Sequence, residues 1–282
     1  MKIAISSDSS LDLTKELIEK YDIHVVPFSI VMGEESHLDG EVVGEDLFAY
    51  TKKTGKLART SAVNEMQSEE HFAKLLENHD AVIHFTISSD MSSSYQNACL
   101  AANKFKNVYV VDSRSLSTGV ALEVIYAKKL ALKGLEPEEI VAKVKERIPY
   151  VQASFGIEAV NYLYKGGRCS GVAALAAGMF NIRPQIIVKD GKMVPGRKFR
   201  GNMNRWVKDY TKTTLKEFSN PDHSIVFITY SSATPEVVEW VRNRLKEAGF
   251  KEIYDTRAGG TVACHCGPGT LGVLYFNDGD HE

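Results

Sequence analysis

The sequence predicts an α/β protein of two parts: a three-layer α/β domain with a parallel sheet over residues 1–150, and a two-layer α/β domain with a mixed sheet over residues 151–282. In the first half, short apolar runs alternate with helical stretches, as in a parallel sheet covered by helices on both faces. Near residue 150 this alternation gives way to a hairpin pattern and a less regular order of elements. The 282 residues, 44 % of them hydrophobic, suffice for one large or two modest domains.

In the first half, apolar runs predict strands at 2–6, 24–32, 81–87 and 108–112. Pro27 lies inside the second run and favours an edge strand or a bulge there. Helices are predicted at 13–21 with Asp12 as N-cap, at 45–55, at 68–79 starting from Ser68, at 95–105 and at 117–133. Because ligands bind beyond the carboxyl ends of strands in open α/β sheets, the segment that follows residues 81–87 is a candidate binding loop.

In the second half, the Asp190-Gly191 pair is a turn signal and predicts a hairpin over residues 182–200. The other expected elements are strands at 152–159, 224–232, 251–256 and 271–276, and helices at 172–180, 203–218 and 235–248. The stretch VAALAAGMF at 172–180 is rich in small residues, which suits close packing or the lining of a tunnel.

Composition argues against several classes of protein. The net charge is only −2 and acids and bases are interspersed, so no nucleic-acid partner is indicated. The N-terminus lacks the apolar core of a signal peptide, and no apolar segment is long enough to span a bilayer, so we expect no stable membrane insertion. Four cysteines without a CxxC pair or a disulfide framework favour a reduced, cytoplasmic setting.

The sequence contains no cofactor-binding motif in the structural context that such a motif requires. GPGTLG at 267–272 fits the spacing of a dinucleotide-binding loop, but an apolar strand-like run follows it instead of a helix. The sequence has neither a phosphate-binding P-loop nor a G-x-S-x-G nucleophile motif. His265 stands between Cys264 and Cys266, but in an extended segment neighbouring side chains point to opposite faces, so we expect no metal site.

Two hydroxyl-rich segments are candidates for anion binding. The stretch ISSDMSSSYQNA at 87–98 holds five serines and precedes a predicted helix, whose free N–H groups and dipole favour an anion. The segment ARTSAVN at 58–64 repeats the hydroxyl theme with Thr60 and Ser61. For each segment, an ordinary helix cap or turn is the alternative explanation. Arg168 offers a positive charge that can reach a bound anion or a partner carboxylate.

Taken together, these segments resemble the DegV family of lipid-binding proteins, which includes the carrier subunits of bacterial fatty acid kinase. The resemblance runs nearly end to end through six stretches: SSDSSLDL (6–13), RTSAVN (59–64), ISSDMSSSYQNA (87–98), VDSRSLSTG (111–119), YLYKGGRCSG (162–171) and HCGPGTLGV (265–273). It implies a long-chain fatty acid, such as the 16-carbon palmitate, bound between the two parts of the chain. The carrier would have no catalytic residues and no cofactor, and a separate kinase would phosphorylate the bound acid.

The family's ligand-binding positions correspond to Thr60, Ser61, Ser92, Arg168 and His265. Ser93 stands where the family usually has glycine, so either Ser92 or Ser93 is expected to bind the carboxylate. The family also often has a proline after the Thr-Ser pair, which is absent here and leaves that loop less constrained. Arg200 matches a position implied in kinase docking. Two alternatives remain open: a serine hydrolase using Ser92 or Ser93 with His265, and a carrier of another amphiphile such as a retinoid or a sterol.

Overall fold

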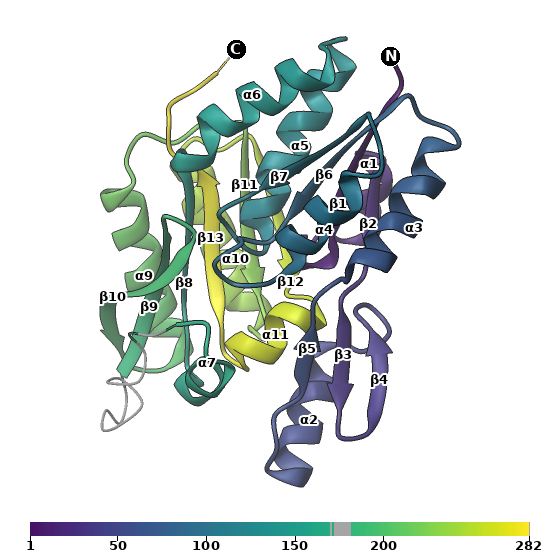
Figure 1. The fold of residues 1–282 in the computed structure, drawn as a ribbon. Coiled ribbons are helices and arrows are strands. Elements are labelled where there is room, and N and C mark those ends of the chain that lie inside the picture. The colour runs from purple at the N-terminus through teal and green to yellow at the C-terminus, as the bar shows by residue number, and fades with distance from the viewer. Residues whose placement is uncertain (170, 172–181, 282) are drawn as a thin grey trace.

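The computed structural model describes residues 1–169, 171 and 182–281 (Figure 1). The predicted α/β class is confirmed, with a parallel sheet before residue 150 and a mixed sheet after it. The parallel sheet has the order β2-β1-β6-β7, with all neighbours parallel. Its strands are β1 (Ile3–Asp8), β2 (Ile23–Val26), β6 (Ala81–Thr86) and β7 (Val108–Asp112).

Helices cover both faces of this sheet because its strands carry apolar side chains on both. Ile5 and Ile83 pack toward α5 and α6, whereas Val82 packs with Phe72 and Ala98 on the side of α3 and α4. The helices of this part are α1 (Lys15–Lys20), α3 (Glu65–Leu76), α4 (Ser94–Ala102), α5 (Thr118–Leu132) and α6 (Pro137–Arg147).

The mixed sheet has six strands in the order β10-β9-β8-β13-β11-β12, in which β11 and β12 are parallel and the other neighbours antiparallel. The strands are β8 (Val151–Gly156), β9 (Ile182–Lys189), β10 (Lys192–Arg200), β11 (Ile225–Tyr230), β12 (Glu252–Arg257) and β13 (Leu271–Phe276). The hairpin at 182–200 is confirmed. Asp190 and Gly191 form its turn with φ of 50° and 80°, the left-handed backbone that a tight hairpin turn requires.

The two sheets share one hydrophobic layer. Phe227 and Leu274 of the mixed sheet belong to the same buried cluster as Val120 and Val124 of α5, which also packs on the parallel sheet. The opposite face of the mixed sheet is covered by α9 (Met203–Glu217) and α10 (Pro235–Glu247), and Trp206 of α9 is fully buried in the cluster that they form with the sheet. Helix α5 is therefore enclosed by both sheets, as Figure 1 shows.

The single strand expected at 24–32 is wrong. The chain divides at Pro27, whose missing N–H cannot continue a strand ladder. Strand β2 joins the parallel sheet, whereas β3 (Ser29–Met32) starts a separate sheet with the order β4-β3-β5. Its partners are β4 (Glu35–Leu38) and β5 (Arg59–Ser61), and α2 (Gly44–Thr54) lies between them in the chain. This three-stranded sheet was not predicted.

Two predicted helix starts are also wrong. Thr14, not Asp12, caps α1 by accepting a bond from the Leu17 N–H, and Asp12 is buried with a left-handed φ of 53°. Helix α3 starts before Ser68, because Asn64 and Gln67 cap one another reciprocally. The remaining short helices are η1 (Ser9–Leu11), η2 (Ile148–Tyr150), α7 (Val160–Gly166) and α11 (Gly260–Cys266).

The predicted helix at 172–180 lies outside the described residues. Within the described part of the chain, no helix has both the length and the apolar character needed to cross a bilayer.

Candidate functional site

A cavity of about 270 Å³ lies where the carboxyl end of the parallel sheet meets α11 and the hairpin of the mixed sheet. All six ligand-binding residues predicted from the sequence line it. Its walls are formed by Phe28, Thr60, Ser61, Ala62, Ile87, Met91, Ser92, Ser93, Leu116, Arg168, Met193, Thr261, Val262, His265 and Cys266. The cavity therefore combines an apolar lining with hydroxyls, one imidazole and one guanidinium, contributed from before and after residue 150.

The serine loop, residues 87–94, is held at both ends by Asp8 of β1. One carboxylate oxygen of Asp8 accepts the Ile87 N–H at 2.9 Å and the Ser94 hydroxyl at 3.2 Å. The other accepts the hydroxyl of Ser10. Burial raises the pKa of Asp8, against these hydrogen bonds, which favour its charged form. The loop is thus fixed to the strand beside it.

Between these anchors, Ser92 and Ser93 face the cavity. The half-buried Ser92 hydroxyl accepts the Ser94 N–H at 3.2 Å, which leaves its own proton available to a ligand. Ser93 is exposed and occupies the N-cap position of α4 without making a side-chain cap bond. Both hydroxyls can therefore donate to an anion at the start of α4.

Thr60 approaches the same cavity from β5, which pairs with β3 so that Thr60 lies opposite Ile30. Its hydroxyl oxygen lies 2.9 Å from Nε2 of His265. Ser61 follows directly and is exposed. The contact joins two residues that are 205 positions apart in the chain.

The expectation that His265 lies in an extended segment is wrong, because residues 260–266 form helix α11. Its N-terminal N–H groups are bound by acids from the first half of the chain. Asp12 accepts the Gly259 N–H at 2.8 Å, and Asp39 accepts the N–H groups of Gly260 at 2.9 Å and Thr261 at 3.3 Å. A Cβ at Gly260 would overlap the Ile30 side chain, so glycine permits the close approach of α11 to β3.

His265 is neutral at physiological pH. Burial, with a smaller effect of the nearby Arg168 charge, lowers its pKa to about 4. Its Nδ1 is buried against Gly166 and has no hydrogen-bond partner among the described residues. With Nε2 as the protonated nitrogen, the imidazole donates to Thr60 and leaves the Thr60 proton free to bind a ligand.

Arg168 lies at the exposed edge of the cavity. It donates to the main-chain carbonyl of Gly166 at 2.8 Å, with a longer contact of 3.4 Å to that of Met91. Within the described residues it has no carboxylate partner, so its charge can act on an anion in the cavity. Arg200 is exposed at the end of β10, opposite Ile182, and is not part of the cavity wall.

Sequence reasoning missed the apolar wall residues and the two helix-capping acids. Phe28, Leu116 and Met193 lie in loops or strands whose pattern carries no sign of a binding role. Asp12 and Asp39 reach the start of α11 through contacts across more than 200 residues. Among the residues that the structure describes, no group of three or more metal-ligating side chains is assembled, and burial raises the pKa values of Cys264 and Cys266 to about 12.

The fold agrees with that of known proteins. The model of the DegV family, described as uncharacterised proteins, matches residues 2–278, and the chain belongs to this family. A DegV domain-containing protein of Caldanaerobacter subterraneus is 31 % identical over 278 residues, which cover 97 % of this chain and 98 % of the relative. A fatty acid-binding protein of Thermotoga maritima is 26 % identical and covers 96 % of both chains.

Solved structures of similar proteins have the same fold. A DegV family protein from Thermus thermophilus, described by its fatty acid binding, superposes with a TM-score of 0.90 at 25 % identity and covers 98 % of this chain and 99 % of its own. A stearic acid-binding protein from Eubacterium ventriosum reaches 0.84 at 27 % identity, with 98 % of both chains covered.

Proposed function

We propose that this protein binds one long-chain fatty acid in the cavity, between its two parts at 1–150 and 151–282. The observation that carries the proposal is the meeting of Thr60, Ser92, Ser93 and His265 in one apolar-lined cavity. The description of its relatives as fatty acid-binding proteins supports the same ligand class.

The chemistry of the cavity suits a carboxylate. The hydroxyls of Thr60, Ser92 and Ser93 donate to its oxygens, and Arg168 adds a positive charge at the edge. A 16-carbon acid such as palmitate would gain about 12 kcal/mol from burying some 15 methylenes at ~0.8 kcal/mol each, before the costs of binding are subtracted. Binding through neutral hydroxyls avoids the large desolvation penalty of a deeply buried ion pair.

We further propose that the protein is a non-enzymatic carrier, which presents the carboxylate to a separate ATP-dependent kinase in the cytoplasm. A carboxylate held by hydroxyls at the cavity edge keeps its charge and can act as the nucleophile toward a phosphoryl donor. Arg200 is the candidate contact for the kinase, because it is exposed and lies outside the cavity.

The hydrolase alternative lacks the contact it needs. A serine nucleophile requires a hydrogen bond to its histidine base, and a third group normally orients that base. Here the hydroxyl that bonds to Nε2 of His265 belongs to Thr60, not to a serine, and Nδ1 of His265 has no hydrogen-bond partner among the described residues. Incubation with p-nitrophenyl esters tests this directly: turnover that is abolished by Ser92→Ala would contradict the carrier proposal.

Native mass spectrometry of the protein purified from cells tests the ligand. We expect a bound species with the mass of a long-chain fatty acid. Recovery of a retinoid or a sterol instead would show that the protein carries another amphiphile and would contradict the proposed ligand class.

A further inference from the structure

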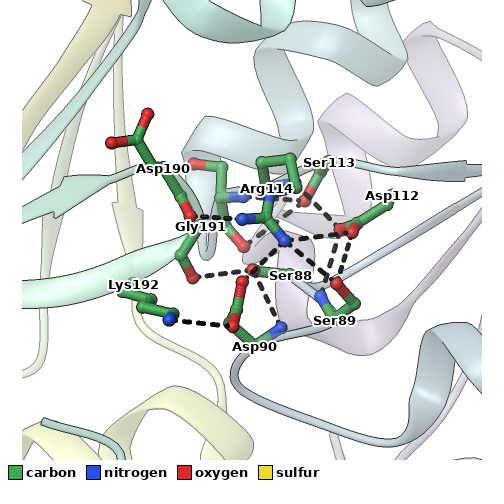
Figure 2. Close-up of polar contacts among 10 residues, drawn as sticks. Ser88, Ser89, Asp90, Asp112, Ser113, Arg114, Asp190, Gly191 and Lys192 are labelled. Atoms are coloured by element: carbon green, nitrogen blue, oxygen red, sulfur yellow. Dashed lines mark hydrogen bonds and ion pairs between the residues drawn. The ribbon is translucent and has the colours of Figure 1, made fainter.

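Arg114, within the stretch 111–119, has no contact with the cavity, yet its side chain joins three segments of the chain. Its Nη1 lies 2.6 Å from a carboxylate oxygen of Asp90 and 3.5 Å from one of Asp112, and it donates to the Ser89 hydroxyl at 3.1 Å. Its Nη2 donates to the main-chain carbonyl of Asp190. Figure 2 shows the guanidinium between the serine loop, the end of β7 and the β9–β10 turn.

Further bonds connect the same three segments. Ser88 donates its hydroxyl to the carbonyl of Gly191 at 2.7 Å, and the Lys192 ammonium lies 3.6 Å from Asp90. Asp112 accepts both the N–H and the hydroxyl of Ser89. The serine loop is therefore bound on one side through residues 88–90, while its residues 91–93 line the cavity on the other.

All three segments continue into the cavity wall. Met91 follows Asp90, Leu116 lies two residues after Arg114, and Met193 follows Lys192. The wall at this point combines the serine loop and the loop after β7 with a hairpin from the other sheet. A shift of the Arg114 contacts would move these wall segments relative to one another.

The backbone at Arg114 indicates that its side chain is needed there. Its φ is 51°, in the left-handed region that glycine and asparagine adopt with less strain. The β9–β10 turn approaches so closely that a Cβ on Gly191 would overlap the Arg114 guanidinium. The local backbone conformation thus disfavours arginine, whereas the contacts of its fork-shaped guanidinium to three segments favour it.

We propose that Arg114 is a positioning residue for carboxylate recognition, which holds the serine loop against the β9–β10 turn so that Ser92 and Ser93 face the head group. This inference rests on the proposed function. It assigns to Arg114 a larger effect on the acid head group than on the acyl chain, because its guanidinium contacts Ser89 and Asp90, which lead directly to the hydroxyls of Ser92 and Ser93.

The test compares palmitate with hexadecanol, which has the same chain without the carboxylate. Both dissociation constants are measured by displacement of a fluorescent fatty acid, for the native protein and for Arg114→Gln, Arg114→Lys and the control Arg244→Gln. Arg244 is half-buried on α10, where its side chain pairs only with Glu247 among the described residues. Thermal unfolding reports whether each variant is folded.

We expect Arg114→Gln to weaken palmitate binding about tenfold, the loss of roughly one hydrogen bond to a charged group, and to leave hexadecanol binding within twofold. Arg114→Lys keeps the charge but not the fork, so we expect a smaller loss, again for palmitate alone. If Arg114→Gln does not fold, the comparison of palmitate with hexadecanol is made with Arg114→Lys. Arg244→Gln should bind both ligands like the native protein.

Two results would overturn the inference: unchanged palmitate binding in both Arg114 variants, or an equal loss for palmitate and hexadecanol, which indicates a general structural role. Failure of the native protein to bind palmitate would instead refute the proposed function, so the two failures are distinguishable.

Discussion

Replacing Thr60 by valine removes one hydroxyl and keeps the volume of the side chain. In the native protein this hydroxyl bonds to Nε2 of His265 at 2.9 Å and lines the cavity. If it donates to a bound carboxylate, its loss removes one hydrogen bond to a charged group, worth about 1.5–3 kcal/mol. The dissociation constant for palmitate should then rise by about ten- to a hundredfold.

The same substitution has a second consequence in the free protein. It leaves Nε2 of the buried His265 without its partner, which should lower the free energy of unfolding by about 1–3 kcal/mol. Isothermal titration calorimetry measures the first effect, and urea unfolding measures the second.

Thr213→Val on α9 is the matched control, because Thr213 lies outside the cavity wall. It should leave palmitate affinity unchanged. An affinity within twofold of native for Thr60→Val would refute the assignment of Thr60 to the head-group site. A loss of stability without a loss of affinity would reduce its role to supporting His265.

Three further predictions follow from individual contacts. Ser92→Ala should weaken palmitate binding by about 1–3 kcal/mol and Ser93→Ala by less, because Ser92 is the more buried; calorimetry showing no change in either would remove both from the site. Burial lowers the pKa of His71 to about 4, so below pH 6.5 the unfolded state binds a proton that the native state does not. Stability should therefore fall with acidification, by up to about 3 kcal/mol for this group at pH 4, and urea unfolding of His71→Gln should show a shallower pH slope. Gly260→Ala should destabilise the protein by about 1–3 kcal/mol, because its Cβ would overlap Ile30; an unchanged melting temperature would contradict the close packing of α11.

The sequence predicts the fold class well because its strands are short, almost wholly apolar and separated by clear helix patterns. The prediction from sequence fails where contacts between residues far apart in the chain determine the local structure. Residues 24–32 form one apolar run, but Pro27 sends its two halves to different sheets. Helix α11 contains one glycine, two β-branched residues and two cysteines among its seven residues, so its own sequence does not favour a helix. Asp12 and Asp39, from the other end of the chain, bind its N-terminus.

The candidate site, too, can be predicted only in part from the local sequence. Hydroxyl-rich segments next to predicted helices point to Thr60 and Ser92, but the local sequence alone equally allows ordinary caps. Their meeting with His265 depends on the position of α11, a segment that was predicted to be extended and is a helix. The resemblance to the DegV family connected these residues, and the structure places them around one cavity.

Mass measurement of what the protein carries from the cell tests the central claim most directly. Native mass spectrometry, followed by denaturing extraction, should reveal one long-chain fatty acid per protein chain, reduced in the Thr60→Val and Ser92→Ala variants. Protein that carries no lipid and does not bind added palmitate would contradict the claim.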